Sequence, residues 1–158
     1  MSRRRQAKKR EPQPDWKYGD ALVGRMISTV LRRGKKSLAS RIVYSAIDLA
    51  NKEKNETADP LEIVRKAVNT IRPRVEVKAR RVGGATYQVP MEVSVERGTS
   101  LAVRWLVEIA ASKKGVPAYK ALAQEIKDAA NNQGNAIKKR DEIHRMAQAN
   151  KAFAHFRW

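Results

Sequence analysis

The sequence contains no cysteine, few aromatic residues and no long hydrophobic run. Without cysteine the chain can form no disulfide framework, no cysteine-based zinc site and no thiol nucleophile, and it suits a reducing compartment. It has no run of about 18 apolar residues that could form a transmembrane helix. The first residues, Met1 to Arg5, lack the apolar segment of a signal peptide. We therefore expect a soluble protein without a secretory leader.

Acidic residues are also scarce, and positive charge is in excess. The 158 residues include 34 Lys+Arg against 16 Asp+Glu, which gives a formal charge of +18. A chain of this length can bury one core without cross-links, and 42% hydrophobic residues are enough to form it. The composition predicts one folded, cationic domain whose partner is a polyanion.

No catalytic or metal-binding motif is evident. The only imidazoles are His144 and His155, and their spacing does not match a helical zinc pair, so we interpret His144 as an exposed helix residue. The segment Gly34-Lys35-Lys36-Ser37 lacks the earlier glycine of a phosphate loop, because position 29 is threonine. Most acids have Lys or Arg at helical spacing, which predicts surface pairing. We predict no enzyme activity and no cofactor.

The chain divides into a flexible basic N-terminal arm, residues 1–18, and a domain over residues 19–158. The first ten residues hold six cations and no acid, and Pro12 and Pro14 disfavour helix. Such an arm cannot bury enough apolar surface to order itself. It is either a solvated tail or a segment that becomes ordered on phosphate.

The domain is predicted to be mainly α, with six helices and one inserted β-hairpin. Apolar residues recur at helical spacing in six segments, which we place at about 20–32, 36–54, 59–72, 99–112, 117–130 and 135–152. Asp20 is a candidate N-cap, and Asp59 followed by Pro60 gives the clearest helix start. We expect Trp105 in the core and also inward positions for Leu31, Leu38, Ile137, Ile143, Met146 and Ala147.

Residues 74–93 change to a period of two around Gly83-Gly84, which predicts a β-hairpin. Only one acid, Glu76, offsets the cations on its outer face and turn flank, Arg74, Lys78, Arg80 and Arg81. For Arg80 and Arg81 we expect few intramolecular partners. The hairpin either protrudes as a probe for a groove or lies flat on the helices, with its cations in solvent.

The cations are spread over the arm, the corner between the first two helices, the hairpin and the last helix. No helix-turn-helix or zinc-finger spacing is present, and this scatter suits a folded RNA that is recognised by shape. A chromatin-type DNA-binding protein would share the charge. A peripheral membrane protein would need exposed bulky apolar residues on a basic helix, whereas these apolar stripes are needed for a core. The residues alone predict a nucleic-acid binder, with RNA favoured.

Several long segments carry a family resemblance. They are Ser2-Arg3-Arg4-Arg5, Gly34-Lys35-Lys36-Ser37, the hairpin run from Val75 to Pro90, Leu101-Ala102-Val103-Arg104-Trp105, and the run from Met146 to Trp158. In this order they resemble bacterial-type small-subunit ribosomal protein seven over essentially the whole chain. One departure is Trp16, because the family usually has a second proline after Asp15.

The resemblance implies a structural constituent of the small ribosomal subunit, in the cytoplasm or in an organellar stroma. Such a protein binds the 3′ major domain of 16S ribosomal RNA, nucleates assembly of the head, and lies near the exit-site tRNA and the mRNA. Small-subunit ribosomal proteins nine and eleven are the implied neighbours. No membrane and no small-molecule substrate are implied.

The resemblance also implies which residues contact RNA. For ribosomal RNA they are Arg3, Arg4, Arg5, Lys8, Lys9, Arg10, Arg25, Arg32, Lys35, Lys36, Arg74, Lys78, Arg97 and Arg104. For the tRNA and mRNA they are Arg80, Arg81, Gly83, Gly84, Lys138, Lys139, Arg140 and Arg145. Arg25 and Arg104 could instead pair with acids on neighbouring helices. The terminal aromatics either pack on the last helix or contact a protein neighbour.

Overall fold

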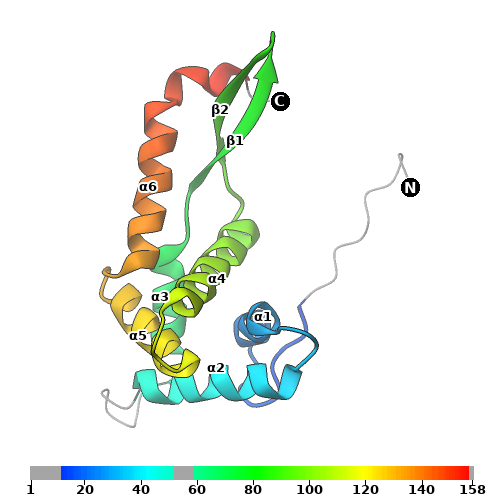
Figure 1. Cartoon of the computed structure of the whole chain (residues 1–158), viewed down its shortest axis with the longest axis vertical. Coiled ribbons are helices and arrows are strands. Elements are labelled where there is room, and N and C mark those ends of the chain that lie inside the picture. The colour runs from blue at the N-terminus through cyan, green and yellow to red at the C-terminus, as the bar shows by residue number, and fades with distance from the viewer. Residues whose placement is uncertain (1–11, 52–58, 157–158) are drawn as a thin grey trace, which may run out of the picture.

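The computed structural model describes residues 12–51 and 59–156 of the chain (Figure 1). Within these residues six α-helices, one 3-10 helix and one antiparallel hairpin follow one another, which confirms a mainly α fold. In chain order they are α1 (Ala21–Val30), α2 (Lys36–Asn51), α3 (Glu62–Ile71), β1 (Val75–Val82), β2 (Ala85–Glu92), α4 (Val95–Ser112), α5 (Ala118–Ala130), α6 (Asn135–Ala149) and η1 (Lys151–Phe156). Most of the predicted arm, and the predicted end of the second helix at Lys54, lie outside the described residues.

Asp20 and Asp59 were both predicted to start helices, and the structure confirms this for Asp20 but not for Asp59. Asp20 is the N-cap of α1, and its carboxylate accepts a hydrogen bond of 2.6 Å from the Leu22 amide. Asp59 instead accepts from the Leu61 amide at 2.9 Å, which forms a turn before the helix. The α3 helix therefore begins later than Asp59-Pro60 suggested, with Leu61 as its N-cap.

The predicted bounds of two later helices are wrong. The α4 helix begins at Val95 and not near Thr99, because the Ser94 hydroxyl accepts from the Arg97 amide and caps a turn further back. The α6 helix ends at Ala149, and the chain continues as η1. The predicted helix over 117–130 is confirmed by α5.

The core lies where α5 packs against α2, α3 and α4. We call helices α1 to α5 together the body. Each of them contributes side chains that are fully buried, among them Met26, Ile47, Ile71, Leu106 and Ile126. Trp105 is 6% exposed and belongs to this core, as predicted. These side chains stabilise the body through burial of apolar surface.

Three side chains that were predicted to face inward are exposed: Leu31 (36%), Leu38 (48%) and Met146 (44%). Leu31 is the C-cap of α1 and has a non-helical backbone, so it leaves the helical stripe. Leu38 lies in the first turn of α2. Met146 lies on α6, which rises above the body and buries only Ala136, Ile137 and Ala147.

The hairpin has a two-residue turn, as its sequence predicts. Gly83 and Gly84 have φ angles of 57° and 92°, which favours glycine at both positions. The strands pair from Val82 opposite Ala85 down to Val75 opposite Glu92.

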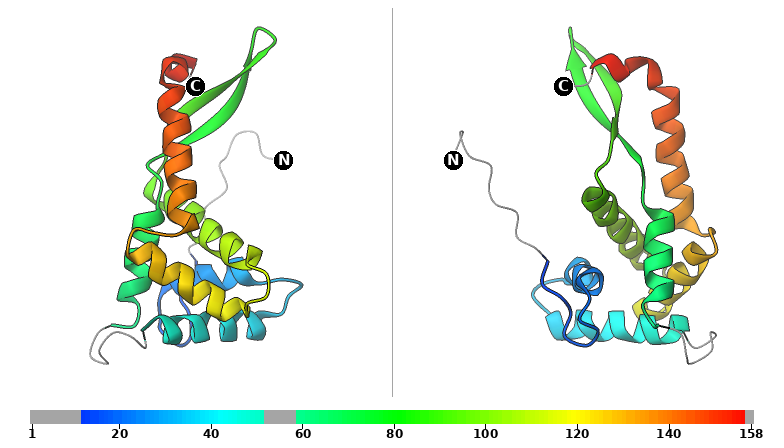
Figure 2. Two further views of the ribbon diagram at one scale, coloured as in Figure 1. Left: turned by 60° about the vertical axis from the view of Figure 1, so that its left-hand side comes forward. Right: turned by 180° about the vertical axis from the view of Figure 1, so that it is seen from behind.

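The hairpin rises from the body, and it does not lie flat on the helices (Figures 1 and 2). It is not isolated either, because α6 packs against β1 and η1 packs against β2. At its base, a Cβ on Gly98 would lie 2.8 Å from Cγ of Arg72, so the chain entering β1 is pressed against α4. We call β1, β2, α6 and η1 together the hairpin arm.

Candidate nucleic-acid interface

The corner between α1 and α2 presents four adjacent cations, which we call the corner cations: Arg32, Arg33, Lys35 and Lys36. Arg33 (φ 52°) and Gly34 (φ 75°) both have left-handed backbone, so the chain reverses within a few residues. All four side chains are exposed. None of them has a carboxylate partner among the described residues, so the corner is a concentrated, unneutralised positive charge.

Arg25 is held by α4, but not by an acidic side chain. Its guanidinium donates to the Ser100 hydroxyl at 3.0 Å and to the Glu96 carbonyl oxygen at 3.3 Å. Among the residues that the structure describes, Arg25 therefore does not form the alternative ion pair with an acid of a neighbouring helix. Both acceptors of Arg25 are uncharged groups, so they do not neutralise its guanidinium. Arg25 also lines a groove between α1 and the start of α4.

Arg97 and Lys78 share one carboxylate at the base of the hairpin. Two nitrogens of Arg97 bond to Glu76 at 2.8–2.9 Å, and the Lys78 amine lies 3.3 Å from it. Burial opposes ionisation of Glu76, but the hydrogen bonds from Arg97 and Lys78 outweigh it, so the pKa of this carboxyl is lowered. Two cations against one anion leave a net positive charge here.

Arg104 and Arg74 extend the charged surface. Arg104 is exposed on α4, two helical turns after Arg97. The Arg74 side chain is exposed, while its backbone amide donates to Nε2 of His144 at 3.2 Å. Within the described ranges neither guanidinium has a carboxylate partner. Both are available to phosphate.

Two neighbouring arginines near the hairpin turn lie in different environments. Arg81 is exposed together with Gly83 and Gly84. The Arg80 guanidinium instead donates to the Phe156 carbonyl oxygen and is half-buried. The expectation that a turn flank offers few intramolecular partners is therefore wrong for Arg80.

The terminal aromatics pack on the hairpin, which was neither of the two expected alternatives. The Tyr87 ring of β2 lies 5.0 Å from that of Phe153 and 5.1 Å from that of Phe156. The two phenylalanine rings are stacked 6.4 Å apart. Trp158 lies outside the described residues. Alternating strand residues gave no signal of this contact, because it joins segments far apart in the sequence.

The four predicted cations of α6 are used in two ways. Lys138 and Arg145 are exposed. The Lys139 amine pairs with Glu108 at 3.3 Å and lies 5.7 Å from the Trp105 ring centre. The Arg140 guanidinium donates to the Thr70 carbonyl oxygen at 2.6 Å, and its side chain is only 18% exposed.

Arg140 and His144 together hold the connection between α3 and β1. Thr70 is in the last turn of α3, where carbonyl groups lack helical partners, so Arg140 caps that end. His144 accepts from the Arg74 amide one helical turn further along. Burial, with the positive charge of Arg140, lowers the pKa of His144, which suits a neutral acceptor. The interpretation of His144 as an exposed residue is therefore wrong.

The predicted arm residues Arg3, Arg4, Arg5, Lys8, Lys9 and Arg10 lie outside the described residues. Trp16 is the feature that sequence reasoning undervalued: it was noted only as a departure from a family pattern, yet it is 95% exposed. Its signal was a large aromatic residue in a segment without an apolar periodicity.

The described residues contain no group of three or more His, Cys, Asp or Glu side chains that could bind a metal ion. Among the helices that the structure describes, none is long and apolar enough to cross a bilayer.

Comparison with known proteins gives a consistent result over the full length. The family model described as "Ribosomal protein S7p/S5e" matches residues 2–151. A protein of Akkermansia muciniphila named "Small ribosomal subunit protein uS7" is 58% identical over 158 residues, which is 100% of both chains. The uS7 proteins of Thermotoga neapolitana and Thermotoga maritima are 56% and 54% identical over 156 residues, 99% of both chains in each case. The chain therefore belongs to the ribosomal protein S7p/S5e family, and it is a structural ribosomal protein and not an enzyme.

Proposed function

We propose that this ribosomal protein works in the small subunit of a cytoplasmic ribosome, where it binds the 3′ major domain of 16S ribosomal RNA and nucleates assembly of the head. The full-length relatives are named small-subunit proteins, which supports this placement. The observation that carries the RNA-binding proposal is the cluster of exposed corner cations without a carboxylate partner among the described residues. Unpaired cations displace counterions from phosphates, and that release drives association with RNA.

The anchoring surface in this proposal runs from the corner cations across Arg25 to the hairpin base. It continues over Arg104, Arg74, Arg97 and Lys78. The six cations in the first ten residues of the N-terminal arm would add to it. Glu76 neutralises only part of this surface. A broad surface of this kind fits an RNA whose phosphates follow an irregular fold.

The hairpin turn lies at the opposite end of the molecule from the α1–α2 corner (Figure 1). A protein anchored through its body would therefore project Arg81, Gly83 and Gly84 away from the anchoring RNA. This geometry supports the proposal that the tip faces the exit-site tRNA and the mRNA. Lys138 and Arg145, the exposed cations among the four predicted on α6, remain part of that proposed surface. Small-subunit proteins nine and eleven remain the proposed protein neighbours.

The decisive experiment compares two triple variants of the full chain in filter binding to a transcript of the 16S 3′ major domain. R32A/K35A/K36A removes three corner cations. K66A/K114A/K120A removes three other exposed lysines and is the matched control. The corner variant should bind more weakly, with the slope of log affinity against log salt reduced by about 2. The control should keep the wild-type slope.

Competitors define the specificity in the same assay. A transcript of the 16S 5′ domain and a duplex DNA of equal length should compete much less well than the 3′ major domain. Equal competition by the DNA would contradict the ribosomal proposal and favour a general polyanion binder. Equal slopes for the two triple variants would remove the corner from the interface.

A further inference from the structure

Trp16 is the most exposed of the large apolar side chains in the part of the chain that the structure describes. Its exposure is 95%, against 36–66% for the other exposed members of this class. An indole carries a large apolar surface, and single exposed apolar residues are common. Exposure alone therefore proves little, and the inference depends on how the chain around Trp16 is held.

The residue before Trp16 is fixed from several directions. Asp15 is only 8% exposed, and its carboxylate accepts from the Tyr44 hydroxyl at 2.6 Å and from the amides of Lys17 and Tyr18 at 3.0 and 3.1 Å. Its backbone amide donates to the Asp20 carbonyl oxygen at 3.1 Å. The loop that carries the indole is thus closed on itself and tied to α2.

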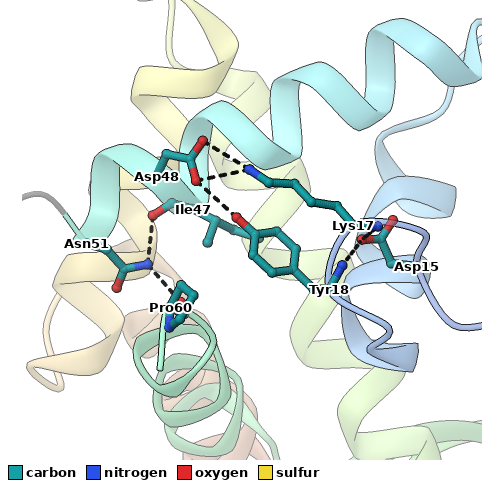
Figure 3. Close-up of polar contacts among 7 residues, drawn as sticks. All are labelled: Asp15, Lys17, Tyr18, Ile47, Asp48, Asn51 and Pro60. Carbon is teal, nitrogen blue, oxygen red and sulfur yellow. Dashed lines mark hydrogen bonds and ion pairs between the residues drawn. The ribbon is translucent and has the colours of Figure 1, made fainter. Parts of the chain in front are cut away.

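The residues after Trp16 are tied to α2 as well (Figure 3). The Tyr18 hydroxyl donates to Asp48 at 3.0 Å, and the Lys17 amine lies 3.4 Å from the same carboxylate. The rings of Tyr18 and Tyr44 meet edge to face at 5.9 Å. Trp16 lies between these anchored neighbours, and its own side chain has no such anchor and is almost entirely in solvent.

The segment that leads into the loop packs directly on α1. A Cβ on Gly24 would lie 2.4 Å from the Gln13 carbonyl oxygen, so only glycine allows this approach. The loop is therefore held from both sides before any partner binds. A pre-organised group loses little conformational freedom on binding, which favours affinity.

A cavity of about 670 Å³ lies beside the indole. Trp16, Ser28, Ser40 and Lys36 are among the residues that line it. They offer one flat aromatic face, two hydroxyl groups and one ammonium group around a single recess. The Ser28 hydroxyl donates to the Gly24 carbonyl oxygen at 2.9 Å, so its oxygen remains as an acceptor. Lys36 is also a corner cation, so the recess continues the proposed RNA surface.

We propose that Trp16 stacks on an unpaired base of the ribosomal RNA, with the phosphate of that nucleotide near Lys36 and the base edge facing Ser28 and Ser40. This inference rests on the proposed function. Unpaired bases that leave an RNA helix are bound by aromatic stacking and by hydrogen bonds to their edges. Stacking is apolar and needs no cation, so it adds affinity that salt does not remove.

The test compares Trp16→Leu and Trp16→Phe in filter binding to the 16S 3′ major domain. Leucine keeps apolar volume without an aromatic face, and its affinity should fall by roughly 5- to 150-fold. Phenylalanine should retain most of the affinity. Val116→Ala, which changes another exposed apolar side chain (45% exposed), should bind like wild type. The salt slope should stay unchanged in all three, because no phosphate contact is lost.

A second readout uses intrinsic fluorescence in a Trp158→Phe background. The remaining tryptophans are Trp16 and the buried Trp105. Titration with the transcript should quench the exposed indole, and the quench should disappear in the W16L/W158F variant. A quench that persists without Trp16 would contradict stacking.

The outcomes separate this inference from the proposed function. If W16L binds the transcript as tightly as wild type while the corner variant loses its salt slope, the stacking inference fails and the RNA-binding proposal survives. If W16L binds naked RNA normally but enters assembled subunits poorly, the indole contacts a protein neighbour and the inference is also overturned. If wild type does not prefer the transcript, the proposed function itself fails.

Discussion

The α1–α2 corner and the hairpin arm are both rich in cations, but they use them differently. The corner cations are exposed and, among the described residues, have no carboxylate partner. In the hairpin arm, Arg80 and Arg140 donate to backbone carbonyl groups, and Lys78 and Lys139 pair with acids. The same residue types therefore stay without an acidic partner in one region and, at these four positions, hold the chain together in the other. Arg81, Lys138 and Arg145 of the hairpin arm are exposed like the corner cations.

This difference follows from the amount of core in each region. The body buries apolar side chains from five helices, so it does not depend on the corner cations to hold it together. A two-stranded hairpin is marginal on its own and needs packing from neighbours. In this chain α6 and η1 supply that packing, and the polar contacts of their cations and of the hairpin fix how they meet. A formal charge of +18 consequently overstates the charge available to RNA.

The largest loss of stability should come from Arg140→Ala, which tests whether the cations of the hairpin arm hold the chain together. This change removes a charged donor from the Thr70 carbonyl group at the end of α3, and we expect the free energy of unfolding to fall by about 2 to 3 kcal/mol. Urea unfolding followed by circular dichroism measures it. Arg145→Ala, on the same helix but exposed, is the matched control and should leave stability within about 0.5 kcal/mol of wild type.

The same two variants test the division of roles in RNA binding. R140A, where folded, should keep the salt slope of wild type. An R140A protein of full stability with a reduced slope would show that Arg140 faces RNA and that the two regions do not differ in this respect.

Most of the fold could be predicted from the sequence, because apolar periodicity, helix caps and turn residues are local signals. The turn at Gly83-Gly84 and the cap at Asp20 lie where the residues predict them. The misjudged positions depend on tertiary contacts. Met146 follows the helical stripe, yet it is exposed because α6 rises above the body. Periodicity gives the face of a helix but not how far along the helix the partner extends.

The candidate site was less predictable, because the chemistry of a cation does not reveal its partner. Arg140 and His144 occupy the inward stripe of α6 with Ile137 and Ala147, and that position was a signal that both are structural. Arg80 gave no such signal, since its acceptor is a backbone carbonyl group 76 residues away. Long-range contacts to backbone groups leave no trace in a single sequence.

A smaller effect should follow from loss of the aromatic contacts that join η1 to the hairpin. Tyr87→Leu keeps an apolar side chain but removes both ring contacts, and we expect a loss of about 1 kcal/mol in urea unfolding. Tyr87→Phe is the control and should match wild type, because the rings remain. If Y87L equals Y87F in stability, the terminal aromatics do not hold the hairpin arm together.

The smallest effect should come from Glu76, at the base of the hairpin. Its pKa is lowered because the hydrogen bonds from Arg97 and Lys78 outweigh burial, so the folded state favours the carboxylate. The resulting stabilisation is complete above the ordinary value of 4.5 and is lost as pH falls through the lowered pKa. Because Arg97 and Lys78 are about half exposed, the contribution is less than about 1 kcal/mol.

Glu76→Gln should therefore be slightly less stable than wild type at pH 7, and the difference should shrink on acidification below pH 4.5. Unfolding in urea at a series of pH values measures both. Glu92→Gln, an exposed acid on β2, is the control and should show no such convergence. Freed from Glu76, Arg97 and Lys78 would resemble the corner cations, so E76Q should also bind the transcript with a steeper salt slope than wild type. An unchanged slope would mean that pairing with Glu76 does not withhold these cations from RNA, and the contrast between the two regions would then be one of stability alone.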